Sequence, residues 1–386
     1  MKQFIWLAVC LAICKIAVVK NADTAGSSIK PKASKKPKPV VPTVEPFSCI
    51  SDSGKETPWY VIYKLPSSAG DEYLYMDDGS QKWSLKKTFM AKNGPFMRTF
   101  AAFFDNPYKQ NSLAIFYNKQ PGPGGVPQRK TDSLSRGIVL ATKSRLAWIV
   151  HSFPAFPATT LDGTVLRDKS TAGMLVCLSL DNQLAELGEF LQYENISIYY
   201  SHKGDAAIPQ SVKQLLNGQP IESTPLRKVR RFRLLNAAQR NPIVFAKLGI
   251  IRQDIYSQFI TLSSPPKRFT TIWNGKHSKP AQLLKAVCNP PYSLADYIAS
   301  RKPPKAVVVK MDTDNGERSI RNSEDLSTWA LQGNAMWCFS DLMHVPAQHE
   351  QSGGAVCFPS NGFPNLVRAF SAPAGAADLY TSCKRR

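Results

Sequence analysis

Histidine is the side chain best suited to acid–base and nucleophilic chemistry near neutral pH, and this 386-residue chain has five. His277 and Lys279 spell H-x-K, but a match of three residues has a high false-positive rate, and we expect no catalytic role for it. His151 closes an apolar run, WIVHSFP, that is typical of a strand. The remaining three lie in polar stretches without metal-ligand spacing, so we expect surface positions for His202, His344 and His349. The sequence predicts no metal site and no cofactor.

The first residues, MKQFIWLAVCLAIC, place one lysine before an apolar run that is short for a bilayer span. This layout predicts a signal peptide over residues 1–20 and a secreted mature protein without a membrane anchor. Two of the eight cysteines fall in that leader, which leaves an even number with no CxxC pair, so we expect three disulfides. The NIS sequence at Asn195 is a candidate glycosylation site on the same route.

Residues 21–46 are rich in lysine and proline, with KPKASKKPKPVVP at their centre, and they have little to bury. We therefore predict a disordered, extended arm. The whole chain has a formal net charge of +21, which favours polyanionic partners such as DNA, glycosaminoglycan or anionic lipid. A solvated basic surface without such a partner is the alternative.

From residue 47 onward, runs rich in β-branched and aromatic residues alternate with helical patterns. WYVIYKLP, EYLYMD, GIVLAT and LAWIVHSF predict strands, whereas Asp181–Gln192 places three leucines on one face of a helix that Asp181 could cap. KAVVVKMD, residues 305–312, predicts a buried strand in the second half. The alternation predicts a mixed α/β fold.

Several of these pieces occur in the order of a known family: PWYVIYKLP, EYLYMDD, WIVHSFPAFP, EDLSTW and SGGAVC. Together they resemble the deoxyribonuclease II family, including its plancitoxin-like members, over nearly all of residues 47–383. The resemblance implies a phospholipase D-like pseudo-dimer of two mixed-sheet α/β halves, here residues 47–205 and 206–386. In that family each half brings one H-x-K motif to a central cleft, and DNA is cut without a metal at acid pH through a phosphohistidine.

Both motifs are altered in this chain. The first place reads SLSRG, with Leu134 and Arg136 where the family has histidine and lysine, and the second reads DLSTW, with Leu326 and Thr328. Leucine can neither attack phosphorus nor carry a proton, and removing one covalent nucleophile can lower turnover about a millionfold. Arg136 keeps a cation that could clamp a phosphate. His151 matches a histidine of the family pattern near the cleft, as a residual phosphate contact or as an ordinary histidine at a strand end.

Two further predictions concern charge and cross-links. The segment LRKVRRFRLL interleaves cations with an aromatic ring, so we expect a nucleic-acid surface or a merely solvated one at Arg227, Lys228, Arg230, Arg231 and Arg233. The family resemblance implies three disulfide pairs: Cys49–Cys177, Cys288–Cys383 and Cys338–Cys357.

The sequence therefore predicts a secreted deoxyribonuclease II-like protein that is catalytically dead or severely impaired and binds DNA or another polyanion. One alternative is an active, metal-independent acid endodeoxyribonuclease that uses His151 or His277. A second is a secreted interaction protein without a nucleic-acid ligand. Delivery to an acidic, lysosome-like compartment is the alternative to the extracellular space.

Overall fold

The computed structural model describes residues 47–370 except 68–70, 105–107, 165, 167–168, 220, 222–224, 238–239, 257–268, 277–292 and 297–307. The predicted leader, the basic arm, the H-x-K sequence at His277 and the Cys288–Cys383 pair therefore lie outside the described residues. Within the described part, no helix is long and apolar enough to cross a membrane.

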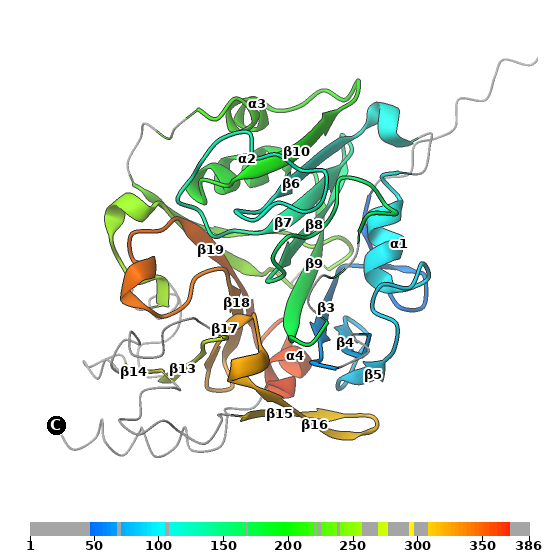
Figure 1. Cartoon of the computed structure of the whole chain (residues 1–386), viewed down its shortest axis with the longest axis vertical. Coiled ribbons are helices and arrows are strands. Elements are labelled where there is room, and N and C mark those ends of the chain that lie inside the picture. The colour runs from blue at the N-terminus through cyan, green and yellow to red at the C-terminus, as the bar shows by residue number, and fades with distance from the viewer. Residues whose placement is uncertain are drawn as a thin grey trace, which may run out of the picture. The chain divides into compact units, whose positions relative to one another are not determined.

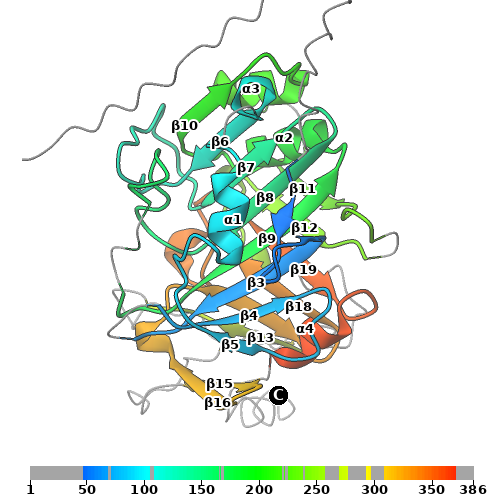
Figure 2. The same cartoon turned by 90° about the vertical axis from the view of Figure 1, so that its right-hand side faces the viewer.

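Two large sheets dominate the structure (Figures 1 and 2). The first has eight antiparallel strands in the order β10-β6-β7-β8-β9-β3-β4-β5, and the second has seven in the order β11-β12-β19-β18-β17-β13-β14, in which only the β13–β14 pair is parallel. The first sheet comprises β3 (Trp59–Lys64), β4 (Tyr73–Asp77), β5 (Ser84–Lys86), β6 (Leu113–Tyr117), β7 (Gly137–Ala141), β8 (Arg145–His151), β9 (Gly173–Asp181) and β10 (Ile198–Lys203). The second comprises β11 (Arg227–Arg231), β12 (Ile243–Lys247), β13 (Phe269–Trp273), β14 (Ser293–Asp296), β17 (Thr328–Gln332), β18 (Met336–Ser340) and β19 (Gly353–Pro359).

The sheets repeat one strand order. β6-β7-β8-β9-β3 in the first sheet corresponds to β13-β17-β18-β19-β12 in the second. In both runs the first four strands have the same order in the chain and in the sheet. The fifth strand, β3 or β12, comes earlier in the chain and pairs with β9 or β19. The expected mixed α/β fold is confirmed, and the repeat makes β7 the counterpart of β17 and β8 that of β18.

Buried side chains pack between the two sheets and also on their outer faces, because alternate residues of a strand face opposite sides. On β3, Trp59, Val61 and Tyr63 belong to a core cluster that also contains Val244 and Phe358 of the second sheet. Tyr60 and Ile62 belong to a cluster on the other face of the first sheet, which includes residues of α1 (Pro95–Ala101). A third cluster covers the outer face of the second sheet. The strands are apolar on both faces because both faces are covered.

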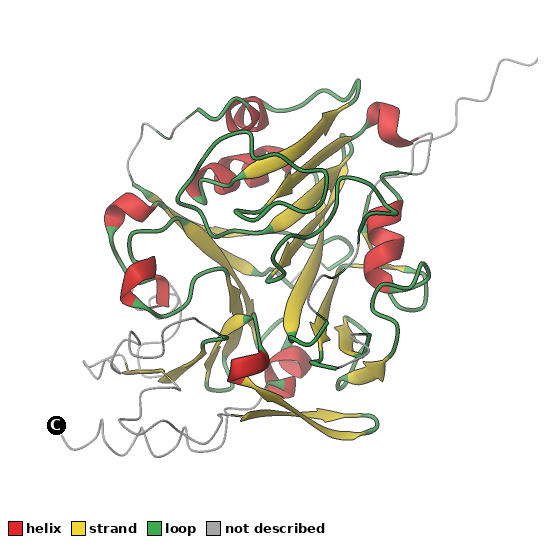
Figure 3. Cartoon of the chain, viewed as in Figure 1, coloured by secondary structure: helices red, strands yellow, loops and turns green. Residues whose placement is uncertain are grey.

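Helices are few and short (Figure 3). Besides α1 they are α2 (Leu184–Tyr193), α3 (Gln210–Leu216) and α4 (Pro364–Ala369), with 3₁₀ turns η1 (Tyr108–Asn111), η2 (Gly249–Ile251), η5 (Asn322–Glu324) and η6 (Pro346–Gln348). The predicted helix is α2, but it begins at Leu184 with Gln183 at the cap position, and no side chain caps it. Asp181 instead ends β9, so its predicted capping role is wrong.

Two small sheets complete the fold: β1 (Cys49–Ile50) with β2 (Glu56–Thr57), and β15 (Val308–Thr313) with β16 (Gly316–Arg321). β15 falls on the run predicted as a buried strand, but its side chains alternate between buried and partly or fully exposed. It forms a two-stranded hairpin with one covered face, so that prediction is wrong. An apolar run alone does not say whether a second layer covers the strand.

Candidate functional site

The four positions that the family resemblance assigns to the two motifs are far apart in the sequence and line one cavity of about 60 Å³. Leu134 and Arg136 come just before β7, and Leu326 and Thr328 lie at the start of β17, the matching strand of the second sheet. His151, the last residue of β8, lines the same cavity. The resemblance therefore located the two segments that meet, and both positions expected to carry histidine hold leucine.

Each leucine is held by the opposite half of the chain. The Leu134 N–H donates to the Ser352 carbonyl at 3.0 Å, and the Leu326 N–H donates to the Ala172 carbonyl at 2.9 Å. Ser352 immediately precedes β19 and Ala172 immediately precedes β9, so these contacts correspond to one another in the repeated strand order. The two segments are thus fixed by backbone bonds that do not depend on their own side chains.

Arg136 brings a buried positive charge to the cavity. Its Nη1 donates to the Ser152 carbonyl at 2.6 Å, while its buried Nε has no hydrogen-bond partner in the described structure. Burial lowers the pKa of Arg136, and the carboxylate of Asp341 opposes that lowering. A guanidinium whose pKa begins so far above neutrality stays charged, so the cavity wall keeps one permanent cation with an unused donor.

His151 is only 1% exposed, and neither ring nitrogen has a hydrogen-bond partner among the described residues. Burial, together with the charge on Arg136, lowers its pKa to about 3. The backbone of Phe153 opposes this effect but falls short of hydrogen-bond geometry. The imidazole is therefore neutral at pH 5 and has no proton to give to a leaving group as an imidazolium would.

Two carboxyl groups behind the cavity were missed by the sequence analysis. Asp341 lines the cavity, and burial raises its pKa to about 6 against the opposing effects of Ser135 and Arg136. Burial beside Asp341 also raises the pKa of Glu194. Glu194 occupies space that only glycine leaves open, because a Cβ at Gly354 would lie 1.8 Å from its Oε1. The glycines of SGGAVC are the one local signal of this close approach.

The second segment is anchored by a buried carboxylate, that of Asp325. Its Oδ2 accepts hydrogen bonds from the Tyr63 hydroxyl, from Trp273 Nε1 at 2.7 Å and from Ser327 Oγ at 2.8 Å, while Oδ1 accepts the Ser327 N–H at 2.9 Å. Burial raises the pKa of Asp325, and these hydrogen bonds oppose the increase. The network ties EDLSTW to two separate strands, β3 through Tyr63 and β13 through Trp273.

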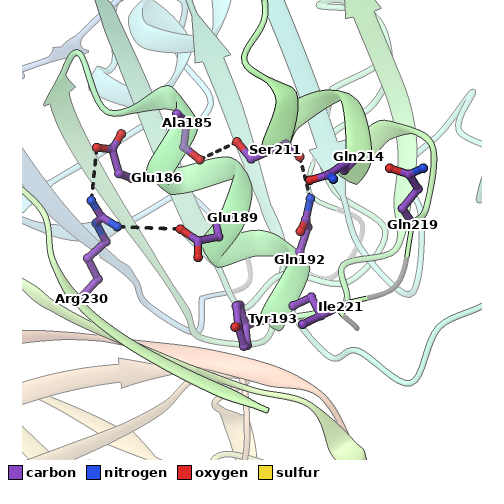
Figure 4. A pocket seen from close by; sticks show the side chains of 10 residues that line it. All are labelled: Ala185, Glu186, Glu189, Gln192, Tyr193, Ser211, Gln214, Gln219, Ile221 and Arg230. Atoms are coloured by element: carbon purple, nitrogen blue, oxygen red, sulfur yellow. Dashed lines mark hydrogen bonds and ion pairs between the residues drawn. The ribbon is translucent and has the colours of Figure 1, made fainter. Parts of the chain in front are cut away.

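The predicted basic surface divides between two faces of β11. Lys228 and Arg230 point to α2, where Lys228 pairs with Glu189. Arg230 pairs with Glu186 at 3.2 Å and with Glu189 at 3.9 Å (Figure 4). Arg227, Arg231 and Arg233 are exposed. The alternation of the strand therefore brings Lys228 and Arg230 together as expected, but onto a face where two carboxylates already neutralise them.

Arg230, Glu186 and Glu189 line a pocket between α2, α3 and β11 (Figure 4). Its polar groups bond to one another: Gln192 Nε2 donates to the Ser211 carbonyl and Ser211 Oγ donates to the Ala185 carbonyl. This pocket holds none of the altered motif positions.

Three other histidines differ from the surface expectation. His344 is 1% exposed, and its Nε2 lies 3.7 Å from the Asp254 carboxylate, so the prediction of a surface residue is wrong. His202 and His349 are partly buried, and His202 Nε2 lies 2.9 Å from the Lys109 carbonyl. Polar neighbours in the sequence gave a false indication because His202 lies on β10 beside η1, and His344 packs against Asp254 and Tyr256. Among the described residues, no three His, Cys, Asp or Glu side chains cluster as metal ligands would.

The cross-links and the glycosylation candidate are also placed. The disulfides Cys49–Cys177 and Cys338–Cys357 are formed as expected, one in each sheet region. Asn195 follows α2 in a left-handed conformation, with its amide bonded to Arg129 and Asp132. It is partly exposed, and its modification stays a prediction.

Comparison with known proteins relates the chain to one family. The family model for deoxyribonuclease II matches residues 48–372. Mouse (Mus musculus) deoxyribonuclease-2-alpha is 24% identical over 342 residues, which cover 84% of this chain and 91% of the mouse protein. Plancitoxin-1 from Acanthaster planci is 22% identical over 350 residues, covering 86% and 92% of the two chains. Human (Homo sapiens) deoxyribonuclease-2-beta is 24% identical over 360 residues, covering 88% and 92%.

Proposed function

The chain belongs to the deoxyribonuclease II family, and from this premise we propose that it is a secreted member that has lost catalysis and binds DNA or another polyanion. The observation that carries the proposal is the composition of the central cavity. Leu134 and Leu326 stand there where the family resemblance implies the nucleophile and the acid. Neither side chain has a lone pair or a proton to offer, so neither can begin a covalent phosphoryl step or protonate the leaving oxygen.

The remaining groups favour binding over turnover. Arg136 is a permanent cation that lines the cavity, which suits a phosphate oxygen. Thr328 offers a hydroxyl but no charge. The net charge of +21 favours association with a polyanion at any pH below the pI of about 9.6. A ligand attracted in this way meets a cavity that can hold it and cannot cleave it.

The alternative of an active acid endonuclease depends on His151, the one histidine at the cavity within the described structure. Its pKa of about 3 leaves it neutral at acid pH, so it would have to act as a nucleophile without a second imidazole to protonate the leaving oxygen. His277 lies outside the described residues. Within the described structure, this alternative therefore has one candidate nucleophile at the cavity and no second imidazole to act as the acid.

Secretion is the proposed destination, since it follows from the leader and the disulfides, and an acidic lysosome-like compartment is the second candidate. A secreted interaction protein without a nucleic-acid ligand is the other functional alternative. It would need the basic surface to be merely solvated.

Salt-dependent binding separates these functions when it is measured beside cleavage. We expect the secreted protein to bind a fluorescent DNA duplex with an affinity that falls steeply with salt, at about pH 5 and about pH 7 alike. Plasmid incubated with it and a chelator should stay supercoiled. Nicking that needs acid pH would favour the active enzyme, and absence of both binding and nicking would favour the interaction protein. Competition by heparin would show whether duplex geometry or charge alone is recognised.

A further inference from the structure

Two buried lysines occupy the same place in the two repeated sheets. Lys64 is the last residue of β3 and Lys247 the last residue of β12, the strand that corresponds to β3. Both are followed by leucine, and they are 0% and 1% exposed. Burying an ammonium group is unfavourable unless it is hydrogen-bonded, so both lysines must have partners.

The partners are backbone carbonyls in both cases. Lys64 Nζ donates to the carbonyls of Leu65 at 3.0 Å and Lys169 at 2.7 Å, and also to that of Thr171. Lys247 Nζ donates to the carbonyls of His349 at 2.9 Å and Gln351 at 2.6 Å, with Gln348 at 3.5 Å. Each ammonium therefore holds the loop that enters the neighbouring strand, β9 for Lys64 and β19 for Lys247.

Those loops are the ones that hold the cavity segments of the opposite half. The residue after Thr171 is Ala172, whose carbonyl accepts the Leu326 N–H and whose N–H donates to the Glu324 carbonyl at 2.6 Å. The residue after Gln351 is Ser352, whose carbonyl accepts the Leu134 N–H. In each half the lysine therefore contacts a loop, and that loop contacts the cavity segment of the opposite half.

We propose that Lys64 and Lys247 are positioning residues of the central cavity, each of which fixes the cavity segment of the opposite half through the loop that it holds. Lys64 sets the segment of Leu326 and Thr328, and Lys247 sets the segment of Leu134 and Arg136. Lys247 has a second effect, because Gln348 in its loop lines the cavity directly. The role concerns the shape of the cavity and does not depend on what the cavity binds.

Because each lysine acts on the cavity segment of the opposite half, each substitution should affect one leucine amide and not the other. In native-state hydrogen exchange with residue resolution, Lys64→Met should speed exchange of the Leu326 amide by about tenfold or more and leave the Leu134 amide within about twofold. Lys247→Met should do the reverse. Methionine keeps the length and apolar stem of lysine but removes the ammonium. Lys55→Met, at an exposed lysine, is the matched control and should change neither amide.

A merely structural role would not produce this crossing. If either methionine variant sped exchange at both leucine amides equally, or at neither, the proposal would be overturned. Lys64→Gln and Lys247→Gln keep one N–H donor and should show the same pattern at smaller amplitude. Failure of both the methionine and the glutamine variants to fold would also contradict it, because a local brace predicts a folded protein with a loosened segment.

Discussion

The two segments that line the central cavity differ in charge and in how they are anchored. The segment before β7 carries a cation in Arg136; its Ser135 N–H donates to Ser133 Oγ at 3.2 Å, and Ser135 and the Arg136 backbone act on the buried carboxyl of Asp341. The segment before β17 has no cation, yet the buried carboxylate of Asp325 ties it to Tyr63 and Trp273. The two segments therefore differ both in charge and in the groups that anchor them.

This difference shows that the fold around the cavity does not rest on the residues that would react. Asp325 is fully buried and serves the backbone of its own segment, while Leu326 beside it faces the cavity. A leucine in place of a histidine removes chemistry and leaves those bonds intact. Such a scaffold can persist as a binding protein after the reaction is gone.

The largest difference between the two halves should appear on removing their disulfides. Cys49–Cys177 closes 128 residues of chain and Cys338–Cys357 closes 19. In the chain-entropy model, Cys49→Ala with Cys177→Ala should lower the free energy of unfolding by about 5 kcal/mol, and the second pair replaced likewise by about 3 kcal/mol. Guanidinium denaturation of both double variants measures this, and equal losses would contradict the chain-entropy argument.

Anchoring can be compared directly with two substitutions. Asp325→Ala leaves the Tyr63 hydroxyl and Trp273 N–H buried without an acceptor, so we expect a loss of about 3 to 4 kcal/mol in the free energy of unfolding. Ser133→Ala removes one neutral acceptor and should lose only about 1 kcal/mol. Glu324→Ala, next to Asp325 but on a surface ion pair, is the control and should change stability by about 0.5 kcal/mol or less. Similar losses in the free energy of unfolding for Asp325→Ala and Ser133→Ala would contradict the view that the two segments are anchored differently.

The carboxyl pair behind the cavity should make the protein more stable in acid. Asp341 has a folded pKa of about 6 against 3.8 for the ordinary group, so the folded state retains a proton that the unfolded chain has lost. The associated stability is fully present below the lower value and is lost as pH rises through the upper one, by about 1 to 2 kcal/mol. Urea unfolding across this range should show the decline, and Asp341→Asn should flatten it. A decline that survives this substitution would have to come from another group, such as Glu194.

The smallest expected effect distinguishes the two faces of β11. Arg231→Gln and Arg233→Gln should each lower the slope of log affinity for duplex DNA against log salt by about 1 if they contact phosphates. Lys228→Gln should change the slope much less, because Glu189 already neutralises that charge. Equal slopes for all three variants would place the DNA elsewhere on the protein.

Sequence reasoning performed well where the signal was local or belonged to the family. The apolar runs at residues 59–64 and 137–141 became β3 and β7, and the leucine spacing became α2. The resemblance placed Leu134, Arg136, Leu326 and Thr328 in corresponding segments, and the structure brings them to one cavity. It also gave both disulfides of the described part.

The missed features depend on contacts between distant residues. Asp325 meets Tyr63 across 262 residues, and Glu194 meets Asp341 only because both flank Gly354 in space. His344 looked exposed because its sequence neighbours are polar, whereas its burial comes from Asp254 and Tyr256. The hydrophobic periodicity of a single segment does not predict which distant residues that segment contacts.

The central claim is that this family member lacks only its reacting side chains, and plasmid cleavage at about pH 5 with chelator tests it most directly. The native protein should be compared with a variant carrying Leu134→His, Arg136→Lys, Leu326→His and Thr328→Lys. The account predicts no nicking by the native protein and measurable nicking by the restored variant, because the backbone bonds that hold both segments are already in place. Metal-independent nicking by the native protein, lost on His151→Ala, would contradict the account and make His151 the nucleophile.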